Sequence, residues 1–281
     1  MPAGSGAWCR LVSAGDARPL GVFDSGIGGL TVLAALQRRL AAESTVYLGD
    51  TARVPYGTKS AEVVTRYALN NARFLAARNI KLLVVACNTA SAVALPALQR
   101  ECGLPVVGVI EPGARRAADA SRTGRVGVIG TEGTVRSGAY LRALEAARSG
   151  LEVRQRPCPL FVPLAEEGWG DSPIAAEVAR IYLEDWAPGI DVLILGCTHY
   201  PLLIPAIRTV LGTGVVLVDS ASAVADAVAA ELAGRDLAAP AGAGAEHAVF
   251  VTDVPGRFCE VGERFLGRVL GDVEQIDLGP G

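Results

Sequence analysis

The feature that most constrains the fold is a regular alternation of short apolar segments with longer helical ones. Runs of β-branched or aliphatic residues lie at 20–24, 45–49, 81–86, 105–109, 125–130, 151–155, 191–196 and 215–219, and predicted helical stretches of 11 to 20 residues separate them. This alternation is typical of βαβ units, whose mainly parallel strands are buried by helices on both faces. The sequence therefore predicts three-layer α/β architecture, in which ligands bind beyond the carboxyl ends of the strands.

The two halves of this region resemble each other in three places. Residues 21–25 (GVFDS) correspond to 127–131 (GVIGT) at an offset of 106, 54–57 (VPYG) to 162–166 (VPLAE) at 108, and Cys87 to Cys197 at 110. Chance similarity between buried strands could produce any one correspondence, but three in one order favour a repeat. We therefore expect two pseudo-symmetric α/β domains whose strand ends face each other across a cleft that holds the active site.

The chain outside the repeat predicts a tail and a returning segment. Residues 1–19 are rich in Gly, Ala, Ser and Pro and predict a flexible N-terminal tail. After residue 219 we expect a helix from Ala221, a loop at 238–246, a strand at 247–252 and a last helix from about Pro255. This segment has no counterpart after the first half. The predicted domains are therefore 20–109 with 219–281, and 110–218.

Composition narrows the classes of function. Of the 281 residues, 51% are apolar, which predicts substantial buried cores. The formal net charge is −3 with scattered Lys and Arg, so we expect small-molecule or protein partners and no direct binding of nucleic acid. No stretch approaches the roughly 20 uncharged apolar residues of a membrane span, and the start lacks the apolar core of a signal peptide. We therefore expect a cytoplasmic protein whose cysteines are free thiols.

Two of the six cysteines stand out. Cys87 and Cys197 each end an aliphatic run (LVVACNT and LILGCTH) and precede small polar residues that are predicted to begin a helix. A helix N-terminus stabilises a thiolate and binds carboxylates. A single buried cysteine is usually inert, but the duplicated setting favours catalysis. A zinc site formed with His199 would lack a fourth ligand. The remaining cysteines have no adjacent base and are interpreted as structural or incidental: Cys9, Cys102, Cys158 and Cys259.

Three kinds of polar residue near these motifs leave alternatives open. Asp24 precedes a glycine-rich loop, 25–29 (SGIGG), and either caps the next helix or holds a substrate ammonium. The loop fits neither a dinucleotide fingerprint nor a P-loop. His199 either serves Cys197 as general acid or base or is a structural histidine. Glu166 and Glu167, expected in a loop after Pro163, either pair with an ammonium or are simply solvated.

These motifs together resemble the glutamate racemases of the aspartate/glutamate racemase superfamily, from about residue 20 onward. The most specific matches are 21–29 (GVFDSGIGG), 49–57 (GDTARVPYG), 86–90 (ACNTA), 161–166 (FVPLAE) and 196–202 (GCTHYPL). The resemblance implies interconversion of L- and D-glutamate without cofactor or metal, which supplies D-glutamate for peptidoglycan synthesis. It further implies a two-base mechanism in which one cysteine thiolate removes the α-proton and the other cysteine, as thiol, delivers a proton to the opposite face.

The resemblance also assigns roles to residues. Cys87 would serve D-glutamate and Cys197 L-glutamate, Asp24 and His199 would each assist the cysteine on their own side, and Glu166 would support His199 or the ammonium. The implied substrate-binding residues are Asp24, Ser25, Pro55, Tyr56, Gly57, Asn88, Thr89, Thr198 and His199. A homodimer is expected, and some members of the family are said to bind DNA gyrase.

Three alternatives remain at this point. The first is a related two-cysteine racemase acting on aspartate, a hydantoin or a similar small acid. The second is a cysteine hydrolase that uses Cys197 with His199 and needs no role for Cys87. The third is a binding protein, because two opposed α/β lobes also suit a sensor.

Overall fold

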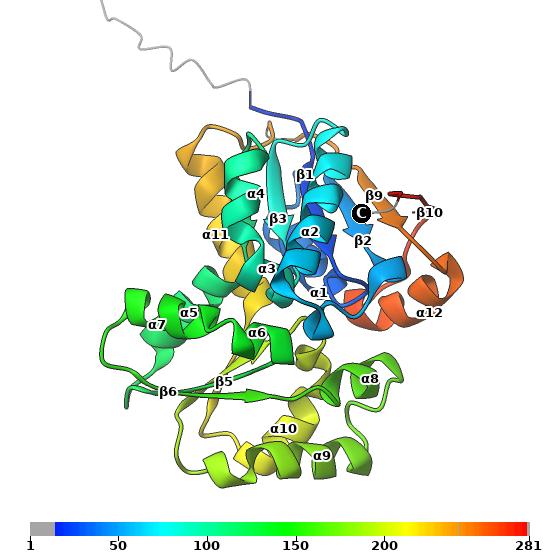
Figure 1. Ribbon diagram of the computed structural model, residues 1–281. Coiled ribbons are helices and arrows are strands. Elements are labelled where there is room, and N and C mark those ends of the chain that lie inside the picture. Colours follow the sequence, from blue (N-terminus) through cyan, green and yellow to red (C-terminus); the bar gives the residue numbers. More distant parts are fainter. Residues whose placement is uncertain (1–14, 241, 280–281) are drawn as a thin grey trace, which may run out of the picture.

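The computed structural model describes residues 15–240 and 242–279, and within them the chain forms two parallel sheets covered by helices (Figure 1). The first sheet has the strand order β10-β9-β2-β1-β3-β4 and the second β6-β5-β7-β8. All recorded pairings are parallel. The order β2-β1-β3-β4 recurs as β6-β5-β7-β8, which confirms the predicted α/β fold with two similar halves.

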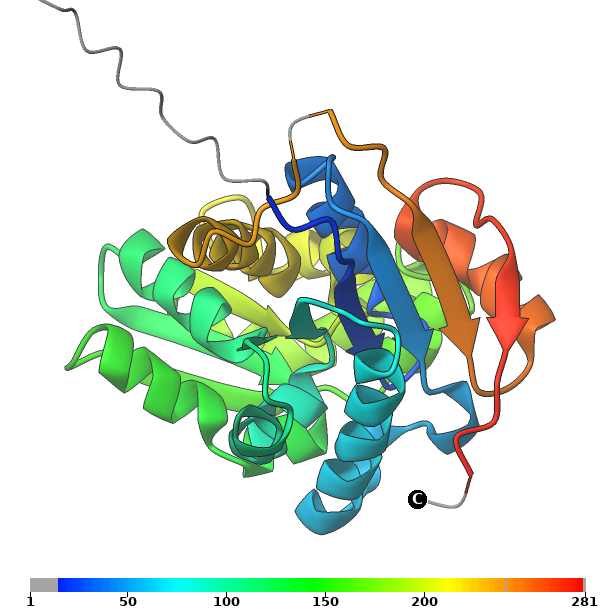
Figure 2. The same cartoon turned by 90° about the horizontal axis from the view of Figure 1, so that it is seen from above.

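The strands coincide with the predicted apolar runs. The first sheet contains β1 (Leu20–Asp24), β2 (Thr45–Gly49), β3 (Leu82–Val85), β4 (Val106–Gly108), β9 (His247–Val251) and β10 (Val273–Gln275). The second contains β5 (Arg125–Gly130), β6 (Glu152–Pro157), β7 (Val192–Gly196) and β8 (Val216–Asp219). Strand β10 was not predicted, because its three residues, VEQ, carry no apolar run; it lies beside β9 at the edge of the first sheet (Figure 2).

The helices are more fragmented than predicted. They are α1 (Leu30–Arg39), α2 (Ala61–Ala76), α3 (Asn88–Val93), α4 (Leu95–Glu101), α5 (Ile110–Ala120), α6 (Glu132–Arg136), α7 (Ala139–Ala147), α8 (Phe161–Glu166), α9 (Pro173–Leu183), α10 (Ile204–Leu211), α11 (Ser220–Gly234) and α12 (Pro255–Leu266). Short 3₁₀ helices lie at Thr51–Arg53, Tyr56–Thr58, Glu184–Trp186 and Tyr200–Leu203. Several fall below the expected 11 residues because a new helix with Pro96 in its first turn follows α3, and Gly138, at φ +65°, separates α6 from α7.

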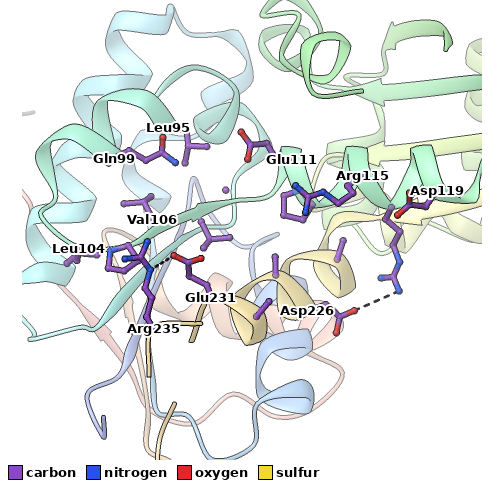
Figure 3. Close-up of a pocket in the computed structure, with 18 of the residues that line it drawn as sticks. Leu95, Gln99, Leu104, Val106, Glu111, Arg115, Asp119, Asp226, Glu231 and Arg235 are labelled. Carbon is purple, nitrogen blue, oxygen red and sulfur yellow. Dashed lines mark hydrogen bonds and ion pairs between the residues drawn. The ribbon is translucent and has the colours of Figure 1, made fainter. Parts of the chain in front are cut away.

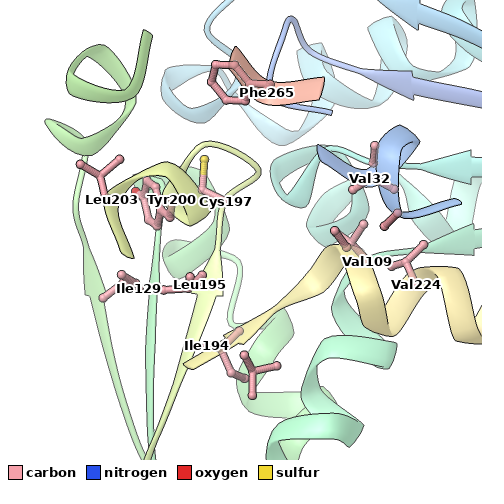
Figure 4. Packing of buried hydrophobic residues seen from close by; sticks show 14 of the residues in the cluster. Val32, Val109, Ile129, Ile194, Leu195, Cys197, Tyr200, Leu203, Val224 and Phe265 are labelled. Atoms are coloured by element: carbon pink, nitrogen blue, oxygen red, sulfur yellow. The ribbon is translucent and has the colours of Figure 1, made fainter. Parts of the chain in front are cut away.

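The central strands of the first sheet, β1, β2 and β3, are buried on both faces. Phe23 and Val85 pack on one side against Leu75 of α2. Val22 and Val84 belong to a second cluster on the opposite side, which also contains residues of α1, α11 and the second sheet. Figure 4 shows this second cluster at close range. The two sheets therefore share one continuous apolar core.

The segment after residue 219 returns to the first sheet, as expected. Helix α11 packs on both α1 and α5, and β9 then pairs with β2, with His247 opposite Thr45. This pairing agrees with the predicted assignment of the segment, while the domain limits themselves stay a prediction. In the part of the chain that the structure describes, no helix is both long and apolar enough to cross a membrane.

Most of the predicted tail, with Cys9, lies outside the described residues. Its described end is packed rather than free: the Asp16 amide donates to the Ala238 carbonyl (3.0 Å) and the Lys81 ammonium donates to the Asp16 carbonyl. Lys81 also forms a buried ion pair with Glu43 at 2.5 Å. These contacts lie at the end of the first sheet where its strands begin, opposite the end that carries Cys87.

Candidate active site

Cys87 and Cys197 follow equivalent strands of the two sheets. Strand β3 lies beside β1 as β7 lies beside β5, and each is followed within two residues by its cysteine. Both cysteines are buried, at 5% and 7% exposure. Both line the same cavity of about 70 Å³. The fold therefore brings together two thiols that are 110 positions apart in the sequence.

The cavity collects most of the residues predicted to bind substrate. Its predicted lining residues are Ser25, Pro55, Tyr56, Gly57, Asn88, Thr89, Glu166, Thr198 and His199, in addition to the thiols. Sequence reasoning missed five further lining residues, Gly26, Ile27, Val54, Thr131 and Val162. Thr131 could have been found, because it is the counterpart of Ser25 in the repeat.

Asp24 differs from the other predicted site residues because it does not line the cavity. It is completely buried, and its Oδ2 accepts from the Gly26 amide at 3.0 Å. Burial raises its pKa, although the charge of His199 and nearby amides oppose the shift. Helix α1 is capped by Gly29 without any side-chain hydrogen bond, so Asp24 is not the helix cap.

Burial and a nearby carboxylate favour the neutral form of the Cys87 thiol. Its Sγ donates to Ser25 Oγ at 3.6 Å and accepts from the Ala90 amide at 3.5 Å. Burial, followed by the charge of Asp24, raises the pKa of Cys87 to about 12. The start of the following helix acts in the predicted direction, because the Ala90 amide lowers the pKa of the thiol. Helix α3 has only six residues, and its amide contact does not outweigh burial.

Cys197 has a histidine and a carboxylate beside it. Its Sγ lies 3.8 Å from His199 Nδ1, and His199 Nε2 lies 3.1 Å from Glu166 Oε1. Burial of His199 opposes its charge, but the hydrogen bonds to Cys197 and Glu166 and the charge of Asp24 raise its pKa to about 10. The hydrogen bond from His199 lowers the pKa of Glu166. His199 thus lies between a carboxylate and a sulfur, and both contacts favour its charged form.

Two local predictions on this side are wrong. No helix begins directly after Cys197; a turn precedes the 3₁₀ helix Tyr200–Leu203, and α10 begins only at Ile204, with prolines near the start of both elements. Glu166 lies at the end of α8 rather than in a loop. Glu167, by contrast, is exposed and lies 3.5 Å from Arg257, away from the cavity lining.

The cavity walls are held by buried polar contacts. The Tyr56 hydroxyl donates to Asp50, whose Oδ1 also pairs with Arg53 Nε at 2.8 Å. Across the cavity, Thr89 Oγ1 and Thr131 Oγ1 lie 2.9 Å apart and join the two halves of the chain. The halves also approach closely elsewhere, because a Cβ at Gly28 would lie 2.3 Å from Thr198 Oγ1.

A larger cavity lies elsewhere. It measures about 1130 Å³ and is bounded by α5, α11 and the edge strand β4 (Figure 3). Its polar lining consists largely of charged side chains such as Arg115, Glu111 and Asp226, and it contains neither thiol. The smaller cavity is the candidate active site because the nucleophilic and titratable groups converge there. Among the described residues, no group of three His, Cys, Asp or Glu side chains could hold a metal ion.

A small cavity with one thiol from each of two similar sheets, and a different set of partners beside each thiol, is suited to proton transfer on two sides of a small substrate. The family model for Asp/Glu/Hydantoin racemase matches residues 20–228. The chain therefore belongs to the aspartate/glutamate/hydantoin racemase family, whose members are isomerases.

Individual relatives agree with this assignment. The glutamate racemase of Geobacter metallireducens is 58% identical over 262 residues, which cover 93% of this chain and 97% of the relative. The crystal structure of glutamate racemase from Thermus thermophilus in complex with β-chloro-D-alanine is 48% identical, with a TM-score of 0.85 over 93% of this chain and 98% of that one. The structure from Francisella tularensis in complex with D-glutamate is 38% identical, with a TM-score of 0.88 over 94% and 98%.

Proposed function

We propose that this protein interconverts L- and D-glutamate by a two-base mechanism that uses no cofactor. The observation that carries the proposal is the convergence of Cys87 and Cys197 on one small cavity from equivalent strands of two sheets. Inversion at a carbon needs a base on one face and an acid on the other, and the opposed halves supply one thiol each. The names of the relatives, together with the D-glutamate bound in the Francisella structure, support glutamate as the substrate.

The proton transfers are the same in both directions, with the roles of the two cysteines exchanged. In the direction from L- to D-glutamate, the Cys197 thiolate takes the α-proton, so that the Cα–H bond breaks and an S–H bond forms. The electron pair stays on the substrate as a carbanion delocalised into the carboxylate. The Cys87 thiol then delivers its proton to the opposite face and becomes a thiolate. The reverse direction begins with Cys87 as base and Cys197 as acid.

The neighbours of the thiols fit these starting states. The raised pKa of Cys87 keeps it as the acid in the protein without substrate. The cationic His199, 3.8 Å from Cys197, stabilises negative charge on that sulfur, and Glu166 holds the imidazolium in place. Binding of a substrate ammonium would bring positive charge close to Cys87 and allow that thiol to ionise when D-glutamate is the substrate.

Substrate binding is assigned to the residues that line the cavity. Ser25, Tyr56, Gly57, Asn88 and Thr198 present hydroxyl, amide and backbone groups to it. Asp24, buried behind the Gly26 amide, acts indirectly, through its charge on Cys87 and His199. We further propose that the D-glutamate made here supplies peptidoglycan synthesis.

The test is incubation of the purified, cofactor-free protein with L-glutamate in deuterated water, with optical rotation and the α-proton NMR signal followed together. The proposal predicts loss of both signals at related rates. L-Aspartate, assayed in parallel, is predicted to react far more slowly. Retention of both glutamate signals would contradict racemisation, and faster reaction of aspartate would favour the related aspartate enzyme instead.

A further inference from the structure

Tyr140 contacts the chain next to each of the two thiols. It lies on α7, is completely buried, and its hydroxyl accepts from Asn88 Nδ2 at 2.8 Å. Asn88 directly follows Cys87. The Tyr140 ring packs beside Gly196, the residue before Cys197, since a Cβ at Gly196 would lie 3.0 Å from Tyr140 Cε2. One side chain therefore joins the two catalytic segments.

The hydroxyl of Tyr140 has a second partner that completes its hydrogen bonding. Ser220 Oγ lies 3.2 Å away, at the start of α11. Since the hydroxyl accepts from Asn88, its own proton is free for Ser220. Burial raises the pKa of Tyr140 to about 12, so the hydroxyl keeps this proton at neutral pH. The chain Asn88–Tyr140–Ser220 thus runs from the cavity to the helix that connects the second sheet with the first.

This arrangement leaves one atom of the Asn88 amide for the substrate. Asn88 lines the cavity, and its Oδ1 is buried without a hydrogen-bond partner among the described residues. A buried carbonyl oxygen without a hydrogen-bond partner is unfavourable, so a donor group that enters the cavity and binds this oxygen is stabilised there. Because Tyr140 holds the nitrogen side of the amide, the oxygen side is available to a donor group of the ligand.

We propose that Tyr140 is a positioning residue for the racemisation proposed above: its hydroxyl fixes the Asn88 amide in the orientation that binds substrate beside Cys87. Tyr140 touches neither substrate nor either sulfur in this role and acts only through Asn88. The inference rests on the proposed function, and its test separates the two.

The experiment compares Tyr140→Phe with the matched control Tyr200→Phe. Tyr140→Phe keeps the ring against Gly196 and removes only the hydroxyl. Tyr200 is equally buried, and its hydroxyl donates to the Cys158 carbonyl at 2.9 Å, away from Asn88. We expect Tyr140→Phe to lower kcat/KM for both enantiomers about tenfold, mainly through KM, because one hydrogen bond that orients a binding group is lost. Tyr200→Phe should stay within about twofold of the wild type in kcat/KM.

A double-mutant cycle distinguishes positioning from a general structural role. In the Asn88→Ala background, Tyr140→Phe should have no further effect on kcat/KM, because the group it positions is absent. An equal loss in both backgrounds, or no loss in the wild-type background, would overturn the proposal. If Tyr140→Phe fails to fold by circular dichroism, Ser220→Ala is measured in the same cycle and should give a smaller loss that also vanishes without Asn88. A wild-type protein inactive on both enantiomers would instead overturn the proposed function, and with it this role.

Discussion

His199 is the residue that makes the two sides of the cavity chemically unequal. It contacts both Cys197 and Glu166, whereas among the described residues Cys87 has only Ser25 and the Ala90 amide within hydrogen-bond distance. The two thiols of a symmetric reaction are therefore assisted differently. We expect substitutions on the His199 side to change the pH dependence of the reaction as well as its rate.

Glu166→Gln tests the partner of His199. The contacts of His199 raise its pKa to about 10, and Glu166 contributes one of them. Without the carboxylate, we expect the alkaline limb of the kcat/KM profile to move to lower pH by about one unit. The measurement is the pH–rate profile for each enantiomer. Glu167→Gln, in the adjacent exposed residue, is the matched control and should leave the profile unchanged; an unshifted Glu166→Gln profile would contradict the role of this pair.

The same pKa shift predicts how stability depends on pH. A histidine whose pKa rises from 6.5 in the unfolded chain to about 10 in the folded protein binds its proton more tightly when folded. Its contribution to the free energy of unfolding is fully present below pH 6.5 and is lost as pH rises through about 10. Urea unfolding between pH 6.5 and 10 should show this loss in the wild type and a smaller one in His199→Gln. Identical slopes in the two proteins would argue against a charged His199.

The sequence predicted most of the residues that line the cavity, but not the direction in which each side chain points. Cys87, Cys197 and His199 stand in recognisable motifs at strand ends. That Asp24 points behind the cavity while Ser25 lines it depends on the path of the 25–29 loop, which no residue pattern specifies. The contact of Glu166 with His199 depends on where α8 ends, which the sequence did not predict.

The loop before α1 determines how closely the two halves approach. A Cβ at Gly28 would lie 2.3 Å from Thr198 Oγ1 and 2.5 Å from His199 Nδ1, both in the other half of the chain. Gly28→Ala should therefore displace His199 and lower kcat/KM on the order of 100-fold, the effect expected of a displacement of about 1 Å at a catalytic group. Gly256→Ala in α12, where a Cβ would meet nothing within 4 Å, is the control; equal activity of both variants would contradict the close approach.

One buried ion pair stabilises the end of the first sheet where its strands begin. The Lys81 and Glu43 side chains are 0% and 5% exposed and 2.5 Å apart. Lys81→Met leaves a buried carboxylate without its partner and should lower the free energy of unfolding by about 3–5 kcal/mol. Adding Glu43→Gln removes that charge, retains an acceptor for the Ala239 amide, and should restore part of the loss. Urea denaturation measures both; an unchanged single variant would contradict the structural role.

Helices and strands could be predicted where the apolar residues follow a single regular pattern. All eight apolar runs became strands; the central ones, such as β1, β3 and β7, are buried along their whole length, whereas the edge strand β6 is partly exposed. The helix after Cys197 was misplaced because Pro201 and Pro205 delay it. Pro96 and Gly138 split helices that periodicity alone made continuous. Strand β10 owes its existence to pairing with β9, a tertiary contact that its own three residues do not encode.

At the scale of the whole molecule, the two sheets share an apolar core. Val22 of the first sheet, Val128 of the second and Val224 of α11 belong to one cluster. We therefore expect a single cooperative unfolding transition rather than two. In a variant with Trp8→Phe and Trp169→Phe, fluorescence reports the buried Trp186 alone, in the half that contains the second sheet. It should follow the same urea curve as far-ultraviolet circular dichroism, which reports the whole chain. Separate midpoints would show that the halves unfold independently.

The overall arrangement was predictable because the repeat predicts two similar sheets, and similar sheets place corresponding strand ends alike. The size of the cavity was not. It depends on contacts such as Thr89 with Thr131 and on glycines at close approach, which act only once both halves are assembled.

The central claim, that each thiol serves one face of the substrate, is tested most directly by α-proton exchange in the variants Cys87→Ala and Cys197→Ala. Each is incubated in deuterated water with L- or D-glutamate and followed by NMR and chiral analysis. Neither variant should racemise glutamate at more than about a thousandth of the wild-type rate. Cys87→Ala should still exchange the α-proton of L-glutamate alone, and Cys197→Ala that of D-glutamate alone. Racemisation by either variant at a rate near that of the wild type, or exchange of both enantiomers by one of them, would contradict the two-thiol account.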